Sequence, residues 1–440
     1  MTSDPAIDVL RAEFELPLST LSTVADEFAN AMREGLAGRT SSLRMLPSFL
    51  IPPTGEEHCA VLAMDFGGTN VRVLNVELRG RGAEPVVRQR SYPLVDAAAG
   101  YDFVSARADA TELFDFLAAK LAAEGPYDVH TRLGLTFSFP CEQRAVDRAR
   151  LINWTKEFAT RGVEGEDIGD LLSAALRRAG LHNVHPVVIL NDTVGTLLSA
   201  GYQLPNVEIG AICGTGHNTC YLEPLHPLTG APMLVNLESG NFDAVPVTRF
   251  DAALDRSSEQ PGAQRLEKLV AGRYLGELLK LVLLDLYQLG ALQIPGTPRF
   301  SALRGEALVI SELLAAEGAA SSAAAATEAA LLATLGVQVN DPLSLQRIRS
   351  VAALIANRSS SLVAATFVGV GRYLASTQRS PRSMARVVAI DGSVFEKMPG
   401  YAAHLQQTLD LLTQVPAAMV AVRAKDGSGI GAAIAAATIS

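Results

Sequence analysis

The stretch Asp65-Phe66-Gly67-Gly68-Thr69-Asn70-Val71-Arg72 combines two glycines with a carboxylate and a hydroxyl. Ala60–Met64 is an apolar run and Val71–Val76 alternates apolar with polar residues, which predicts a strand, a glycine turn and a second strand. Glycines allow a tight turn that offers amide N–H groups to phosphate oxygens. The segment is not a P-loop, because a strand follows and Gly-Lys-Ser/Thr does not. An ordinary hairpin turn is the alternative, and this segment alone does not decide between the two.

Strands and helices alternate along the rest of the chain. Four more segments have the apolar character of buried strands: Arg132–Phe139, Val187–Leu190, Val207–Cys213 and Thr219–Leu222. A helix is expected from Ile168 to Gly180, and a long apolar helix from Leu266 to Leu289. The alanine-rich stretch Ala315–Ala333 is expected to be a surface helix or loop. This alternation of strands and helices predicts an α/β protein.

Length and composition narrow the class of protein. The 440 residues favour two domains, and 48% hydrophobic with 19% charged residues is typical of a soluble globular protein. A net charge of -9 argues against a protein that covers nucleic acid. The four cysteines and the histidines show no zinc-ligand spacing. The N-terminus lacks an apolar signal core and no apolar run is long enough for a membrane span, so we expect a cytoplasmic protein without membrane or nucleic-acid partners.

A second glycine turn, Gly214-Thr215-Gly216-His217-Asn218, lies between two expected strands. It offers the same amide groups and a threonine hydroxyl as the first turn. A plain hairpin is the favoured interpretation of this segment taken alone. Two such turns together could clamp the polyphosphate of ATP, and Asp65 at a strand end could hold Mg²⁺ through water.

Asn191-Asp192-Thr193 follows the apolar strand Val187–Leu190. Open α/β sheets bind ligands at the carboxyl ends of their strands, so Asp192 could accept the proton of an attacking hydroxyl. The alternative is a cap for a helix that begins near Val194, and the segment itself does not decide between base and cap.

Several other polar segments suit a sugar or a nucleotide, although each has an ordinary alternative. Asn153-Trp154-Thr155-Lys156 could bind a polyhydroxylated ligand or form a surface loop. Glu238 and Glu267 could each accept sugar hydroxyls, while Glu267 could instead complement a helix dipole. Asp391-Gly392-Ser393 and Asp426-Gly427-Ser428-Gly429 could approach a nucleotide at a helix start or serve as capped loops.

Taken together and in this order, these segments resemble the eukaryotic-type hexokinase and glucokinase family. The resemblance runs from about Met45 to about Ala433. Its most specific part is Trp154-Thr155-Lys156 followed by Gly162-Val163-Glu164-Gly165-Glu166-Asp167. The other matching segments are Met45–Phe49, Asp65–Arg72, Phe137–Cys141, Asn191-Asp192, Gly214–Gly216 with Asn218, Glu267 with Gly272-Arg273 and Gly276–Leu278, Asp391–Ser393, and Asp426–Gly429.

The resemblance implies a two-domain α/β fold of the actin-like ATPase (ribonuclease H-like) type, with a cleft between the domains that closes on sugar. The small domain would comprise residues 59–190 plus 427–440, and the large domain residues 1–58 plus 191–426. The implied reaction is phosphorylation of a hexose at its 6-hydroxyl by ATP with Mg²⁺, as in glycolysis. Glucose is the first expectation, with mannose or fructose as further substrates, and the protein would be a monomer or a homodimer.

The resemblance also assigns roles to individual residues. Asp192 would be the general base, Lys156 would be the second catalytic residue, and Asp65 would reach Mg²⁺ through water. Sugar would be bound by Ser138, Thr155, Lys156, Asn191, Asp192, Asn218, Glu238 and Glu267. Nucleotide would be bound by Asp65, Gly67, Gly68, Thr69, Asn70, Arg72, Gly214, Thr215, Gly216, Arg273, Gly392 and Ser393.

The chain departs from the family pattern at three positions. Ser239 stands where a tryptophan is frequent, Glu142 where a histidine is common, and Ile430 where a lysine is common. Ser239 could alter the loop that supports Glu238 and, with it, the sugar preference. The alternatives are a sugar-sensing regulator with little catalysis and an actin-like protein acting on another substrate. Asp192 with both turns argues against the first, and the Trp154-Thr155-Lys156 segment against the second.

Overall fold

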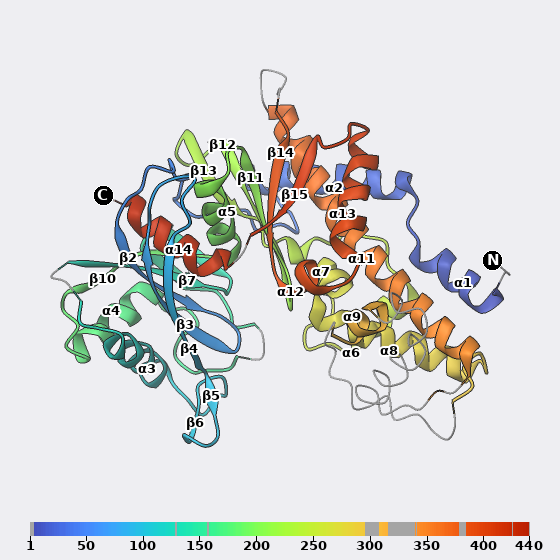
Figure 1. Cartoon of the computed structure of the whole chain (residues 1–440), viewed down its shortest axis with the longest axis horizontal. Coiled ribbons are helices and arrows are strands. Elements are labelled where there is room, and N and C mark those ends of the chain that lie inside the picture. Colours follow the sequence, from blue (N-terminus) through green and yellow to red (C-terminus); the bar gives the residue numbers. More distant parts are fainter. Residues whose placement is uncertain are drawn as a thin grey trace. The chain divides into compact units, whose positions relative to one another are not determined.

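The protein is described here from a computed structural model. It covers residues 4–127, 130–155, 158–294, 308–315, 339, 341–377, 384–424 and 426–439 (Figure 1). The chain forms two compact units. We call Arg44–Ala211, Thr219–Glu238 and Ala424–Ser440 the sheet unit, and Met1–Leu43, Ile212–Asn218 and Ser239–Arg423 the helical unit.

The sheet unit is built on a five-stranded sheet of order β10-β7-β2-β3-β4. Its strands are β2 (Ala60–Phe66), β3 (Asn70–Glu77), β4 (Val86–Pro93), β7 (Thr131–Phe137) and β10 (Val184–Leu190). The β2–β3 and β3–β4 pairs are antiparallel, whereas β7 pairs in parallel with both β2 and β10. Every residue of β2 after Ala60 is buried, as expected for a central strand.

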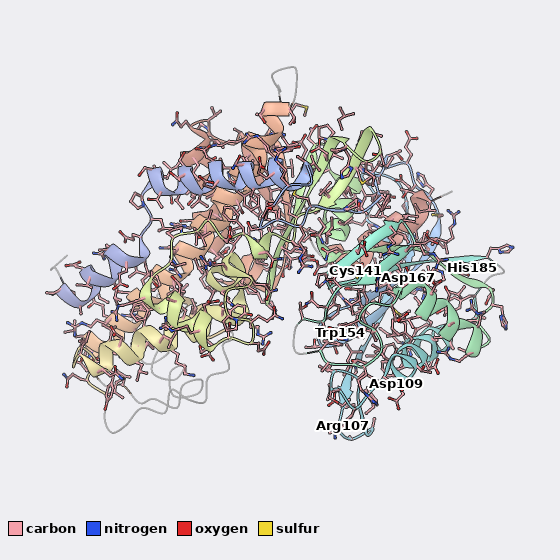
Figure 2. The ribbon with its side chains drawn as sticks, turned by 180° about the vertical axis from the view of Figure 1, so that it is seen from behind. Arg107, Asp109, Cys141, Trp154, Asp167 and His185 are labelled. Carbon is pink, nitrogen blue, oxygen red and sulfur yellow. The ribbon has the colours of Figure 1, made fainter. Side chains whose placement is uncertain are left out.

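Helices α3 (Ala110–Ala123) and α4 (Ile168–Arg178) bury their apolar faces in one core with β2 and β7. Asp109 and Asp167, labelled in Figure 2, cap these two helices by accepting backbone N–H groups of the first turn. Since side chains alternate along a strand, Leu62, Met64 and Phe66 of β2 share this core.

Helix α14 (Gly427–Thr438) packs against both the sheet and α5 (Asp192–Gln203). Its approach to α5 requires glycine, because a Cβ added at Gly431 would lie 2.0 Å from the carbonyl oxygen of Gly195. The approach to β7 is equally close, since a Cβ on Gly134 would lie 2.0 Å from the Ala432 oxygen. Backbone contact of this kind holds α5 firmly against α14.

Further strand pairs complete the sheet unit. Strand β13 (Ala231–Asn236) pairs antiparallel with β1 (Leu46–Pro47) and with β12 (His217–His226). Strands β8 (Cys141–Ala145) and β9 (Arg148–Leu151) form one hairpin, and β5 (Val95–Asp96) and β6 (Tyr101–Asp102) form another. The division between units falls within β12 and within β11 (Val207–Cys213).

The helical unit surrounds the long helix α11 (Pro342–Thr377), which contacts α1, α2, α7, α8, α9 and α13. Its length and apolar composition would allow it to cross a membrane, but 83% of its most apolar window is buried inside the structure, as in a core helix. The other helices are α1 (Pro5–Phe14), α2 (Leu18–Leu36), α6 (Arg249–Ser257), α7 (Arg265–Val270), α8 (Gly272–Gln288), α9 (Leu308–Ala315), α12 (Ser393–Lys397) and α13 (Tyr401–Thr413), with a short 3₁₀ turn at Ser239–Asn241. Strands β14 (Arg386–Asp391) and β15 (Met419–Arg423) pair in parallel.

The structure confirms the predicted hairpin, the predicted strands and the helix α4. The prediction of one helix from Leu266 to Leu289 is wrong, because Ala271 has extended backbone (φ -83°, ψ 143°) and separates α7 from α8. Ala315–Ala333 lies outside the described residues except for Ala315, the last residue of α9. The expected domains, 59–190 plus 427–440 and 1–58 plus 191–426, divide the chain differently from the compact units and stay a prediction.

Candidate active site

Three predicted site segments of the sheet unit follow the carboxyl ends of three adjacent parallel strands. Gly67 follows β2, Ser138 follows β7 and Asn191 follows β10. The register places Phe66 opposite Phe137 and Leu190 opposite Thr136, so these ends meet at one edge of the sheet. This is where open parallel sheets bind ligands.

The first glycine turn is closed by the Gly67 N–H, which donates to the Asn70 carbonyl oxygen at 3.1 Å. The Gly68 and Thr69 N–H groups have no acceptor within the described part of the chain. The Asn70 side chain donates to the Thr69 hydroxyl at 2.9 Å, and both residues are exposed. The turn therefore presents two amide donors and a hydroxyl, as a phosphate site needs.

Asn191, not Asp192, caps α5. Its Oδ1 accepts the Thr193 backbone N–H at 3.0 Å and the Thr193 hydroxyl at 2.7 Å. The helix begins at Asp192, two residues before the expected start at Val194, and the Thr193 N–H also lies 2.9 Å from Asp192 Oδ1. Because the N-terminus of a helix dipole favours negative charge, this position suits an ionised carboxylate.

Asp65 belongs to an ion-pair network with the N-terminus of α14. Its Oδ2 accepts from both Arg72 Nε at 3.1 Å and Arg72 Nη2, and from the Ser428 hydroxyl at 2.8 Å. Arg72 also contacts Asp426 at 3.3 Å and Ser428 at 3.1 Å. The predicted contact of Arg72 with nucleotide stays a prediction, and the structure adds a role in orienting Asp65.

Asp65 fits a water-mediated role toward Mg²⁺. Arg72 and Ser428 donate their hydrogen bonds to Asp65 Oδ2, and no described residue donates to Asp65 Oδ1. No group of three or more His, Cys, Asp or Glu side chains could hold a metal within the residues described. The role of Asp65 toward Mg²⁺ through water therefore stays a prediction.

The sugar-side segment of the sheet unit has a rigid aromatic support. Trp154, labelled in Figure 2, is only 7% exposed, and it packs with Phe139 and Phe158. Its indole N–H donates to the Thr160 carbonyl at 2.8 Å, and its backbone N–H donates to Glu164 at 2.6 Å. Trp154 therefore anchors the partly buried Thr155, whereas Lys156 lies outside the described residues.

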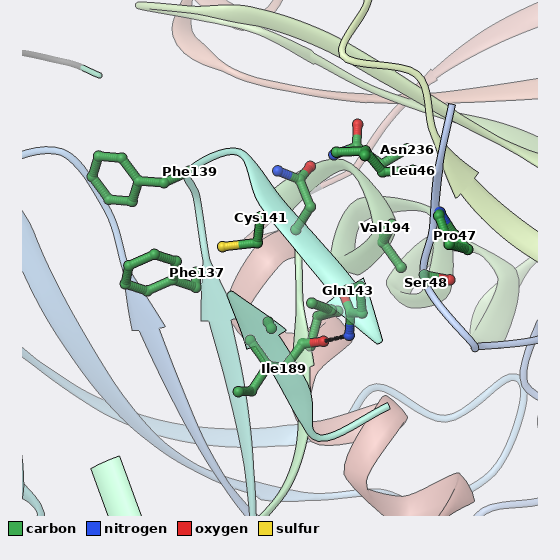
Figure 3. Close-up of a pocket in the computed structure, with 13 residues that line it drawn as sticks. Leu46, Pro47, Ser48, Phe137, Phe139, Cys141, Gln143, Ile189, Val194 and Asn236 are labelled. Carbon is green, nitrogen blue, oxygen red and sulfur yellow. Dashed lines mark hydrogen bonds between the residues drawn. The ribbon is translucent and has the colours of Figure 1, made fainter. Parts of the chain in front are cut away.

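A small pocket in the sheet unit reaches this edge of the sheet (Figure 3). Its apolar lining residues include Phe137, Phe139, Ile189 and Val194, and the side chain of Gln143, which also lines it, donates to the Ile189 carbonyl at 2.6 Å. The polar lining residues are Ser48, Cys141, Gln143, Asn191 and Asn236. Burial, followed by the negative charges of Glu238 and Asp167, raises the pKa of the Cys141 thiol, so the thiol is protonated at neutral pH.

The predicted nucleotide residues of the helical unit meet at the second turn. Gly272 and Arg273, the first residues of α8, donate their N–H groups to the carbonyls of Gly214 at 2.8 Å and Thr215 at 3.0 Å. On another side a Cβ added at Gly392 would lie 2.6 Å from the Cys213 carbonyl oxygen, so only glycine fits there. This brings Gly214, Thr215, Gly216, Arg273, Gly392 and Ser393 into one cluster.

The sugar residues predicted in the helical unit also lie beside this turn. Glu267, in the first turn of α7, has Oε1 3.4 Å from the His217 backbone N–H. Asn218 Oδ1 accepts the Ser239 backbone N–H at 3.1 Å. Ser239, the position where the family often has tryptophan, is fully buried.

His217 is a buried neutral imidazole at the second turn. Its Nδ1 lies 3.8 Å from the Cys213 sulfur, and its Nε2 finds no partner within the described part of the chain. Burial lowers the pKa of His217 from 6.5 to about 4. As the pH falls below about 6.5, His217 takes up a proton in the unfolded chain but not in the folded one. The free energy of unfolding is therefore unaffected by His217 above about pH 6.5 and decreases as the pH drops toward 4.

We expect acidification from about pH 7 to about pH 4 to lower the free energy of unfolding by about 3 kcal/mol through His217. His217→Gln removes this contribution, so the difference between wild type and variant should shrink as the pH falls. Urea denaturation followed by far-UV circular dichroism measures it. Parallel pH profiles for the two proteins would contradict the assignment.

Sequence reasoning did not assign an orienting role to two residues that the structure places against predicted site groups. Ser428 holds Asp65, and Asn236 holds Glu238 by donating to its carboxylate at 2.8 Å. The pairing of Asp65 with Arg72 had a signal in the sequence, since a hairpin turning at Gly67–Thr69 places these two residues opposite each other.

Hexokinase family models match residues 6–202 and 208–438. The chain is 36% identical to hexokinase-1 of Schizosaccharomyces pombe, over 97% of this chain and 89% of that protein. It is 34% identical to human hexokinase-3 over 96% of this chain, but spans only 46% of that longer protein. A solved structure of hexokinase from Schistosoma mansoni complexed with glucose matches all of both chains, with a TM-score of 0.85 and 30% identity.

The chain therefore belongs to the hexokinase family. The resemblance seen in the sequence is confirmed, and so is the expected α/β fold of the actin-like ATPase type. The roles of individual site residues stay predictions.

Proposed function

We propose that this chain transfers the terminal phosphoryl group of ATP to the 6-hydroxyl of a hexose, with glucose as the first candidate and mannose and fructose as further ones. The observation that supports it most is the edge of the five-stranded sheet, where the glycine turn, Ser138 and Asn191-Asp192 follow three adjacent parallel strands. Membership in the hexokinase family supports the same chemistry.

In the proposed reaction the sugar 6-hydroxyl oxygen forms a bond to the γ-phosphorus, while the bond from that phosphorus to the β–γ bridging oxygen breaks. ADP leaves with the bridging oxygen, and the hydroxyl proton passes to the Asp192 carboxylate. Positioning and charge stabilisation dominate in phosphoryl transfer. Asn191 serves this step by capping α5 and so fixing the helix that starts with Asp192.

The other assigned groups bind and orient. The backbone amides of Gly68 and Thr69 and those of the Thr215 turn would receive phosphate oxygens. Mg²⁺, when bound with ATP, would neutralise phosphate charge, and Asp65 would hold it through water. Ser138, Thr155, Lys156, Asn218, Glu238 and Glu267 would bind sugar hydroxyls. A role in glycolysis, a cytoplasmic location and a monomeric or homodimeric state stay predictions.

We expect ADP release that requires ATP, Mg²⁺ and a hexose. A coupled ADP assay with glucose, mannose and fructose tests this and ranks the substrates. Folded protein that binds glucose in calorimetry yet releases no ADP with any hexose would instead support the sugar-sensing regulator. The regulator is not favoured, because the chain keeps Asp192 and both glycine turns.

A further inference from the structure

Asn236, the last residue of β13, holds Glu238 at two points. Its Nδ2 donates to Glu238 Oε1 at 2.8 Å, and its Oδ1 accepts the Glu238 backbone N–H at 3.1 Å. A hydrogen bond to a carboxylate is stronger than one between neutral groups. One amide side chain thus fixes both the backbone and the carboxylate of Glu238.

Glu238 requires this support because its backbone is strained. Its φ of +51° lies in the left-handed region, which costs a non-glycine residue about 1–2 kcal/mol. Asn236 provides a rigid base, since it is 5% exposed and pairs with Leu46 of β1 and with Cys220 of β12. The two hydrogen bonds from this fixed neighbour therefore offset the backbone strain at Glu238.

Asn236 also lies beside a second predicted site segment. It lines the same pocket as Asn191, the cap of the helix that begins with Asp192 (Figure 3). Asn191 fixes the start of the helix that begins with Asp192, and Asn236 fixes the Glu238 carboxylate itself. The effect of the Glu238 charge on the Cys141 thiol, which lines this pocket as well, agrees with a carboxylate held nearby.

We propose that Asn236 is a positioning residue for sugar recognition: it orients the Glu238 carboxylate toward the sugar hydroxyls without touching the sugar itself. This inference rests on the proposed function, because it needs Glu238 to bind sugar. A carboxylate held in one orientation accepts hydroxyls of one stereochemistry and leaves an epimer unpaired. Asn236 therefore controls sugar affinity and epimer discrimination more than the rate of phosphoryl transfer.

Asn236→Asp tests the role with almost no change in size. The variant keeps the acceptor for the Glu238 N–H but places a second carboxylate against Glu238 Oε1. Near pH 8 we expect the glucose Kd and KM to rise by roughly tenfold or more, since a hydrogen bond to a charged group is lost. Two adjacent carboxylates take up a shared proton at higher pH than one alone, so the defect should diminish toward about pH 6. The glucose Kd of the wild type, measured over the same pH range, corrects for the titration of all other groups.

A double-variant cycle separates positioning from general structure. Glu238→Gln alone lowers sugar affinity, and adding Asn236→Asp should cost little more, because the glutamine amide can donate to the new carboxylate. A merely structural role for Asn236 would instead produce the same penalty in both backgrounds. If Asn236→Asp does not fold, as judged by circular dichroism, Asn236→Ser replaces it in the same cycle.

Calorimetric titration with glucose gives the Kd for each variant without any turnover. Wild type that binds glucose but releases no ADP would refute the proposed catalysis and leave this inference open to the same titrations. An unchanged glucose Kd in Asn236→Asp at both pH values, or equal penalties with and without Glu238→Gln, would overturn the inference.

Discussion

Asp192→Asn is expected to lower kcat on the order of 10³-fold or more while leaving the KM for glucose within a few-fold of wild type. Asparagine has the same shape as aspartate, so sugar contacts and the start of α5 should survive. It cannot accept a proton from the 6-hydroxyl, so the loss falls on the transition state. Steady-state kinetics with saturating ATP and Mg²⁺ measures the effect.

The structure offers a matched control for this substitution. Asp170 is also a first-turn carboxylate, on α4, and it is exposed and paired with Arg148. Asp170→Asn should leave kcat within about twofold of wild type, because exposed ion pairs contribute little. Unchanged kcat in the Asp192 variant would remove Asp192 as the base. Equal losses in both variants would show that the effect is not specific to the site.

The parts of the site that the sequence predicted depend on local pattern. Periodicity marked β2, β3 and β10, and the glycines marked the two turns between strands. The position of Asp192 at the end of a buried strand followed from the same pattern. These features are set by residues next to one another, so one sequence is enough to find them.

The parts that the sequence could not predict depend on contacts between distant residues. The pattern from Leu266 to Leu289 predicts one helix and does not place a break at Ala271. The break exists because the first N–H groups of α8 bond to the carbonyls of Gly214 and Thr215. The bond from Ser428 to Asp65 joins residues 363 positions apart. Tertiary contacts of this kind override local propensity.

A buried ion pair in the helical unit is another contact without a sequence signal. Arg358 of α11 donates two hydrogen bonds to Asp251 of α6, each 2.7 Å, and both side chains are only 1% exposed. Asp251 also accepts the Thr248 backbone N–H at 2.6 Å in a capping box. The guanidinium carbon lies 4.6 Å from the centre of the Phe14 ring of α1. The pair thus fixes α11 against α6 and α1.

This pair supports the candidate site through α11. Ser359, the next residue on that helix, donates its hydroxyl to the carbonyl of Val270 at 3.0 Å. Val270 is the last residue of α7, the helix that carries Glu267. The break at Ala271 follows it, and the N–H groups that begin α8 then donate to the second turn. Loosening α11 would therefore disturb the groups around that turn as well as the core.

Asp251→Ala is expected to lower the free energy of unfolding of the helical unit by about 3–5 kcal/mol, because it leaves the Arg358 charge buried without a partner. Arg358 Nε already has no partner within the described residues, so few hydrogen bonds would remain to offset the buried charge of the guanidinium.

The exposed pair of Arg372 with Asp26 in the same unit is the matched control, and Asp26→Ala should cost less than about 1 kcal/mol. Far-UV circular dichroism during urea denaturation follows the helices of both units, most of which lie in the helical unit, whereas the fluorescence of Trp154, the only tryptophan, reports the sheet unit. A loss no larger than that of Asp26→Ala would show that water or a rearranged neighbour satisfies Arg358. If the buried charge is the cause, Asp251→Leu combined with Arg358→Met should recover much of the loss.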